Sequence, residues 1–177
     1  LWFLPMFLVL IGLGTWQVER LHWKVALIAQ MNASLTAPPL TLDQIAKLPA
    51  AEAQYRHVAL KGRFDNAKEA YAFATAEGGT PVYHVLTPLI LSDGRALIVD
   101  RGMIRQNLRD PKTRAAGQLE GEQRVTGVWR TPDPANLFTP KPDLQKRLWF
   151  ARDGKAMAAL DHLTLVAPVV VEADATP

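Results

Sequence analysis

The first eighteen residues carry no charge, and this segment constrains the fold more than any other feature of the chain. Leu1 to Val18 contains thirteen large or medium hydrophobic side chains, and the first charged residue is Glu19. A helix rises about 1.5 Å per residue, so this segment would span about 27 Å, close to the roughly 30 Å hydrocarbon core of a bilayer. We therefore expect a transmembrane helix here.

Two other interpretations of this segment stay open. A cleaved signal peptide would need a small-residue cleavage site, whereas the apolar run leads into the bulky and charged residues Trp16 to Arg20. A buried core helix is the third interpretation. Because the chain begins with Leu1 rather than Met, we expect its natural start upstream, and the positive-inside rule cannot fix the orientation from one flank.

The helix is expected to continue beyond the membrane. Leu21 to Ala33 contains neither glycine nor proline, and the first break is at Pro38. On a helical wheel Arg20 and Trp23 lie about 40° and about 20° from Trp16, so the three share one face. Two indoles beside a guanidinium are typical of an aromatic belt with a cation–π contact. This face either anchors the helix at headgroup level or docks a partner helix or an acidic cofactor group.

Composition excludes several classes of protein. The chain has no cysteine, which removes disulfide scaffolds, thiolate metal sites and cysteine nucleophiles. Its 20 lysines and arginines barely exceed its 17 acidic residues, an excess too small to predict a nucleic-acid partner. We expect no nucleic acid among the partners.

Beyond residue 33 the pattern changes from helical to strand-like. Thr41 is a candidate N-cap for a short helix over 42–48, and a second short helix is expected over 154–160. The pair Asp93-Gly94 predicts a hairpin turn. The strands that alternation and β-branched residues predict are 55–64, 69–75, 81–91, 96–100, 123–130, 147–152 and 163–172. Residues 105–122 are expected to form a solvated loop or lid, and the prolines of 131–143 exclude regular structure there.

Short strands without a βαβ rhythm predict a β-rich α+β fold. The expected organisation is a transmembrane helix with a juxtamembrane extension over 1–33, a linker with a short helix over 34–54, and a β-rich extracytoplasmic domain over 55–177. We expect this domain to be an antiparallel β-barrel or a sandwich-like fold with short helices.

Motifs for catalysis are not found. The four histidines (His22, His57, His84 and His162) lack the spacing of a metal site, and the sequence has no phosphate-binding loop, dinucleotide fingerprint or nucleophile elbow. An enzyme is therefore not expected, and no metal site is predicted. An anchored hydrolase stays an alternative, and it would require a histidine beside Asp100 or Asp153 in a pocket. Arg101 follows a buried run and either closes the barrel or binds a partner.

Several segments together resemble the Surfeit locus protein family of cytochrome c oxidase assembly factors. The shared segments are Gly14-Thr15-Trp16-Gln17 with Arg20 and Trp23-Lys24, Tyr55-Arg56-His57-Val58 with Gly62 and Phe64, Thr87-Pro88-Leu89 before Val99-Asp100-Arg101-Gly102, Phe138-Thr139-Pro140, and Trp149-Phe150 with Asp153 and Met157-Ala158. They occur in the same order along nearly the whole chain. The family usually has Asn and Trp where this chain has Asp100 and Met103.

The resemblance implies an assembly factor of haem-copper cytochrome c oxidase that assists delivery or insertion of haem a into subunit I. It implies two transmembrane helices in the inner membrane, of the cell or of the mitochondrion, around a domain on the periplasmic or equivalent side. Subunit I and the bilayer are the implied partners, with haem A synthase as a further one. The histidine associated with haem lies in the family on a second helix, and no second apolar run follows in this sequence.

Two hypotheses about function follow. In the first, Trp16, Gln17, Arg20, Trp23 and Lys24 contact the cofactor or a partner, since Arg20 and Lys24 could pair with the two propionates of haem a. Arg101 is a further candidate for such a contact. In the second, the protein is a membrane-anchored recognition domain that has no cofactor contact.

Overall fold

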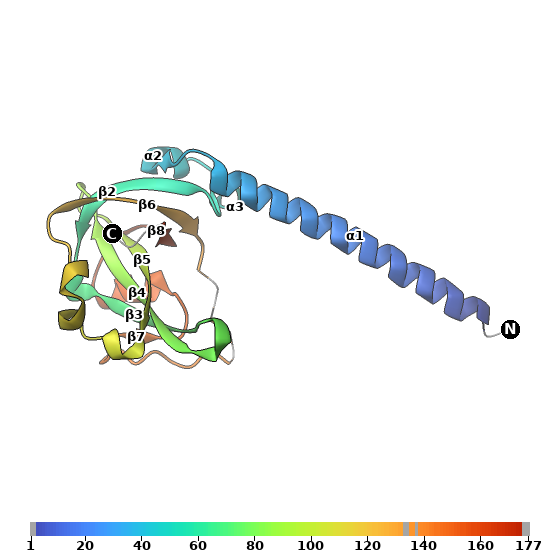
Figure 1. The fold of residues 1–177 in the computed structure, drawn as a ribbon. Helices are drawn as coiled ribbons and strands as arrows, with labels where there is room; N and C mark the ends of the chain where they lie inside the picture. The colour runs from blue at the N-terminus through green and yellow to red at the C-terminus, as the bar shows by residue number, and fades with distance from the viewer. Residues whose placement is uncertain (1–2, 133–134, 137, 175–177) are drawn as a thin grey trace. The chain divides into compact units, whose positions relative to one another are not determined.

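The computed structural model describes residues 3–132, 135–136 and 138–174 (Figure 1). The chain divides into two compact units, Leu1–Ala37 and Pro38–Pro177.

The first unit is one long helix, α1, which spans Phe3–Thr36. Its large apolar side chains are exposed over the described part, from Phe3 at 87% to Trp23 at 64%. The helix continues past residue 33 because no proline interrupts it before Pro38. Among the described residues, no helix combines the length and the mean hydropathy that crossing a membrane requires. Leu1 and Trp2 of the uncharged segment lie outside the described residues.

The second unit is β-rich. Its strands are β1 (Leu40–Thr41), β2 (His57–Phe64), β3 (Ala70–Thr75), β4 (Pro81–Ile90), β5 (Ala96–Arg105), β6 (Glu122–Arg130), β7 (Leu148–Trp149) and β8 (Leu165–Ala173). The pairing order β2-β6-β8-β5-β4 returns to β2 through Arg63 and Phe64 opposite Ile90 and Leu89, which closes a five-stranded barrel (Figure 1). The prediction of a barrel is confirmed, and the sandwich alternative is wrong.

The antiparallel prediction needs one correction. Four of the neighbouring pairs in the barrel are antiparallel, but β5 and β8 run parallel. A closed ring with an odd number of strands cannot alternate direction everywhere, so at least one parallel pair is unavoidable. Two parallel neighbours require a crossover connection. The chain between β5 and β8 supplies it and includes β6, a strand of the ring, and the helix α4 (Gly154–Leu160).

Two apolar clusters form because side chains alternate between the faces of a strand. Leu97 and Val99 of β5 point into the barrel with Val171 of β8, and the short helices α2 (Leu42–Ile45) and α3 (Ala50–Ala53) add Ile45 and Ala53 to this cluster. The alternate residues of the same strands, Ile98 and Val170, form a second cluster outside it. Trp149 of β7 and Met157 of α4 cover that outer layer.

Two glycines allow strands to approach closely within the barrel. A Cβ on Gly62 would lie 2.5 Å from the carbonyl oxygen of Ile90, where β2 meets β4. A Cβ on Gly127 of β6 would lie even nearer to the carbonyl oxygen of Glu172 on β8. Any side chain at these positions would push the neighbouring strand away.

Local predictions hold at the caps and turns. Thr41 caps α2 through a capping box with Gln44, although the helix ends at Ile45 rather than at residue 48. Gly94 adopts φ +83° in the hairpin between β4 and β5, as the Asp-Gly pair predicts.

Other local predictions differ from the structure. The predicted strand over 147–152 is reduced to the two residues of β7. The described residues of 131–143 contain a turn and an isolated bridge from Asp143 to Leu148, and positions 133–134 and 137 of that segment lie outside the described residues.

The largest local correction is at 105–122, predicted as a solvated loop. β5 continues to Arg105, and the segment then forms the 3-10 helices η3 (Gln106–Leu108) and η4 (Pro111–Gly117). Buried polar groups hold these helices against the barrel.

Candidate functional site

The predicted helix face is built by residues one turn apart on α1. The guanidinium of Arg20 lies over the indole of Trp16, 5.1 Å from the ring centroid, as the cation–π interpretation predicts. Trp16 and Trp23 are 48% and 64% exposed. Gln17 and Lys24 are also exposed. All five predicted side chains of α1 therefore lie at the surface of this unit, where a ligand or partner can reach them.

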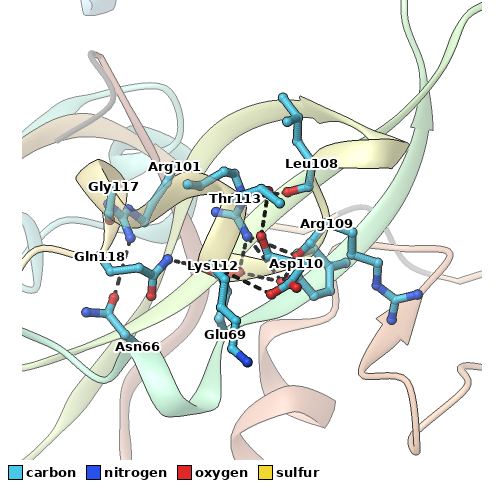
Figure 2. Close-up of polar contacts among 12 residues, drawn as sticks. Asn66, Glu69, Arg101, Leu108, Arg109, Asp110, Lys112, Thr113, Gly117 and Gln118 are labelled. Atoms are coloured by element: carbon cyan, nitrogen blue, oxygen red, sulfur yellow. Dashed lines mark hydrogen bonds and ion pairs between the residues drawn. The ribbon is translucent and has the colours of Figure 1, made fainter.

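Arg101 of β5 lies in a different environment. It is 5% exposed, and its guanidinium stacks 4.6 Å from the centroid of the Phe64 ring. It donates to the carbonyl oxygen of Gly117 and reaches the side-chain oxygen of Asn66 at 3.5 Å (Figure 2). Burial lowers the pKa of this guanidinium, and the nearby charge of Glu69 opposes that shift. These contacts agree with the interpretation in which Arg101 closes the barrel, and a contact of Arg101 with a partner stays a prediction.

Glu69 is the centre of a polar cluster that the sequence analysis did not single out. It precedes β3 and is 4% exposed. Its Oε2 accepts from Gln118 at 3.2 Å (Figure 2). Its Oε1 accepts from Arg114 at 2.6 Å and lies 2.5 Å from the hydroxyl of Tyr71. The single proton of the Tyr71 hydroxyl is shared between this carboxylate and the carbonyl oxygen of Arg109, 2.7 Å away.

The cluster explains why 106–118 is ordered. Burial by itself raises the pKa of Glu69, but hydrogen bonds from Arg114, Tyr71 and Gln118 outweigh it and hold the pKa below its ordinary value. Burial and the carboxylate of Glu69 raise the pKa of Tyr71. An ionised carboxylate inside the domain thus ties η4 to β3.

A second polar cluster lies on the outer face of the barrel. Asp100 of β5 and Glu172 of β8 are direct cross-strand partners in the parallel pair, so two carboxylates stand side by side. Like charges in this position repel. Arg152 compensates them, because its Nη1 contacts Glu172 and lies 3.4 Å from Oδ2 of Asp100. Arg130 adds a second cation, 3.0 Å from Glu172.

The same cluster contains a histidine. Nδ1 of His84 on β4 lies 2.7 Å from Oδ2 of Asp100, whose side chain is 3% exposed. The other carboxylate oxygen of Asp100 accepts from the backbone N–H of Gly102. His84 and Arg152 both line a cavity of about 320 Å³. The remaining residues around this cavity are Ala72, Phe73, Ala74, Asn136, Thr139, Phe150 and Ala151.

This arrangement meets the geometric requirement stated for a hydrolase, namely a histidine beside Asp100 in a pocket. The only hydroxyl among the described lining residues belongs to Thr139, which accepts from the N–H of Asn136 and donates to its side-chain oxygen. Both of these hydrogen bonds of the Thr139 hydroxyl are therefore to Asn136. The described lining therefore supplies an acid–base pair but no available nucleophile. No group of three or more acidic or histidine side chains that could hold a metal ion occurs among the described residues.

The similarity to known proteins extends over both units of the chain. The sequence profile of the SURF1 family matches residues 4–177. The chain belongs to the SURF1 family. The match extends from the exposed helix through the closed barrel, which agrees with the resemblance stated from the sequence segments.

Individual SURF1 relatives show the same extent. The chain is 34% identical to Surfeit locus protein 1 of Takifugu rubripes over 193 residues, which cover 97% of this chain and 79% of the fish protein. It is 33% identical to the mouse protein of the same name, over 97% of this chain and 61% of that protein. The chain is 32% identical to the human protein of that name, over 92% of this chain and 58% of the human protein. The chain thus spans less than two thirds of the mouse and human relatives.

For this SURF1 chain, sequence reasoning predicted the helix face and raised a histidine beside Asp100 in a pocket, but it missed the Glu69 cluster and the carboxylate pair of Asp100 and Glu172. Glu69 stands at the start of an alternating strand, where a carboxylate ordinarily faces solvent. The available signal was its spacing to Tyr71, since residues two apart share a strand face. Arg152 and Glu172 were not singled out, because the parallel pairing that joins Asp100 to Glu172 cannot be read from local pattern.

Proposed function

We propose that the protein is a membrane-anchored assembly factor for haem-copper cytochrome c oxidase, which assists delivery or insertion of haem a into subunit I. The match to the SURF1 family over residues 4–177 carries this proposal. In it, the uncharged segment Leu1–Val18 and the exposed apolar side chains of α1 serve as the anchor. The domain lies on the periplasmic side of the inner membrane, or on the equivalent mitochondrial side.

The helix face fits part of the proposed cargo. Haem a carries two carboxylates and a large apolar ring, and the face offers Arg20, Lys24 and the indoles of Trp16 and Trp23. Arg20 already stacks on Trp16, which holds the guanidinium in place for a charge-assisted bond. His22 lies about 120° around the wheel from Trp16, so the same face offers no imidazole. The face thus suits the carboxylates and the ring, and the iron would be held elsewhere.

The partners in this proposal are subunit I of the oxidase, haem A synthase and the bilayer. The barrel domain would hold a partner protein while the helix face holds the cofactor. This division assigns each unit of the chain one part of the same task.

A recognition domain without cofactor contact is the second candidate, and one exposed ring favours it. Phe138 is 92% exposed, and its backbone N–H donates to the side-chain oxygen of Asn136. An aromatic ring presented at the surface is typical of a protein-binding anchor.

Haem titration of the full chain in lipid nanodiscs separates the two candidates. Cofactor delivery predicts a saturable Soret shift that weakens at least tenfold when Arg20→Ala and Lys24→Ala are combined. His22→Ala, on another face of α1, is the matched control and should leave the shift unchanged. If wild type and the double variant give the same titration, the helix face does not hold the cofactor and the recognition domain is the better account.

A further inference from the structure

The cavity on the outer face of the barrel is lined by both aromatic and polar side chains. The rings of Phe73 and Phe150 lie 6.1 Å apart between centroids and tilt by 46°. His84 and Arg152 stand among the polar lining residues. The volume of the cavity is about 320 Å³. Since a liquid water occupies roughly 30 Å³, the cavity has room for a ligand with one aromatic ring.

Asp100 determines what His84 offers to this cavity. Nδ1 of His84 is buried and lies 2.7 Å from Oδ2 of Asp100, although it forms no hydrogen bond of regular geometry with the described residues. An ionised carboxylate oxygen and an imidazole lone pair would repel at this distance, so the ring carries its proton on Nδ1. In the neutral ring the second nitrogen, Nε2, is then an acceptor. Nδ1 is buried and the side chain of His84 is 21% exposed, so Nε2 is the ring nitrogen left for a ligand.

Arg152 offers the opposite chemistry. Both of its carboxylate contacts, to Asp100 and Glu172, go through Nη1. A guanidinium has five N–H donors and no acceptor. The side chain is 25% exposed and lines the cavity, so donors on Nη2 and Nε remain for a ligand.

We infer that this cavity binds an aromatic hydroxyl, a phenol. A hydroxyl is the simple group that donates and accepts at once, so it can donate to Nε2 of His84 and accept from Arg152. A carboxylate only accepts and an indole only donates, and each would leave one of the two side chains without a bond. The rings of Phe73 and Phe150 select an aromatic group for the hydroxyl to be attached to.

Fluorine NMR of the full chain in nanodiscs, with 4-fluorophenol as the probe, tests this site. The phenol should bind saturably, and 4-fluoroanisole, whose methyl ether cannot donate, should bind about tenfold more weakly. His84→Ala should weaken binding of the phenol by about the same factor. The matched control is His57→Ala, because His57 also contacts a carboxylate, Asp174 at 2.8 Å, but does not line the cavity.

Two results would overturn the inference. One is equal binding of the ether and the phenol to wild type, a comparison that needs no variant and therefore does not depend on how His84→Ala folds. The other is a folded His84→Ala chain, verified by circular dichroism, that binds the phenol as tightly as wild type does.

The phenol could belong to a free molecule or to a tyrosine of a partner protein. Competition against the bound probe separates these sources. Displacement by a short glycine-flanked tyrosine peptide, stronger than by hydroquinone, supports the site and assigns it to a partner's tyrosine. Displacement by hydroquinone alone supports the site and assigns it to a small phenol or quinol. If neither displaces the probe, the cavity does not recognise aromatic hydroxyls and the inference is wrong.

Discussion

At the scale of single residues, the barrel depends on Glu69, an ionised carboxylate inside the domain. It is 4% exposed and is bonded to Arg114, Tyr71 and Gln118. Removing the charge leaves the cation of Arg114 opposite a neutral group in a partly dehydrated site. Such a change is costly because the bond from Arg114 loses its ionised acceptor, and the bonds from Tyr71 and Gln118 are no longer charge-assisted.

Glu69→Gln should therefore lower the free energy of unfolding by about 2 to 3 kcal/mol at pH 7, the usual cost of losing hydrogen bonds to a charged group. Urea denaturation measures it, with the exposed Glu77→Gln as control. A loss below about 0.5 kcal/mol would contradict the role given to Glu69.

The same group predicts a pH dependence. The pKa of Glu69 lies below its ordinary value of 4.5 in the folded chain. Its contribution to stability is therefore complete above pH 4.5 and is lost as the pH falls through the lower folded pKa. The difference between wild type and Glu69→Gln should shrink on acidification below pH 4.5, and a difference that grows there would contradict this sign.

Arg152 has a comparable role on the outer face, where it stands between the carboxylates of Asp100 and Glu172. Arg152→Met should cost about 3 kcal/mol, since it leaves two like charges adjacent. Adding Asp100→Asn should recover part of that loss, because Glu172 would then be the only carboxylate and is still paired with Arg130. Denaturation of Arg152→Met, Asp100→Asn and the double variant gives the coupling energy between positions 100 and 152. Strictly additive losses would show that the carboxylates do not interact through Arg152.

At the scale of elements, the barrel closes because two positions lack side chains. Gly127 of β6 and Gly62 of β2 face carbonyl oxygens of β8 and β4. The obstacle at each position is backbone, so the strain cannot be relieved by a change of rotamer. The strands themselves would have to separate.

Gly127→Ala is expected to destabilise the domain by about 3 kcal/mol or more, the upper range for overpacking. Gly12→Ala on α1 is the matched control, because a Cβ there has nothing within 4 Å. Near-UV circular dichroism during denaturation follows the barrel in both variants. Equal midpoints for Gly127→Ala and wild type would show that β6 and β8 do not meet as described.

Local pattern predicted these elements unevenly. The Asp93-Gly94 hairpin and the Thr41 cap were predictable because each depends on residues within four positions of one another. The 3-10 helices after Arg105 were not, because a polar segment reads as solvated unless its distant partner is known. That partner is Glu69, 45 residues from Arg114.

At the scale of the whole molecule, the chain consists of an exposed apolar helix and a closed barrel. The sequence predicted both units and the cation–π contact on the helix. It could not predict the parallel pair of β5 and β8, because the direction of pairing follows from closing an odd ring rather than from any one strand. Glu172 stands beside Asp100 only through that pairing, and Arg152 contacts both carboxylates.

We propose that this chain helps to load haem a into the oxidase and that the Arg20–Lys24 face of α1 takes part. The most direct measurement is the haem a content of the purified oxidase, relative to copper, from cells whose own gene is replaced by wild type or by the combined Arg20→Ala and Lys24→Ala variant. The account predicts at least a severalfold lower haem a content for the variant at equal protein level, and wild-type content for His22→Ala. A haem a content equal to wild type in the double variant would contradict it.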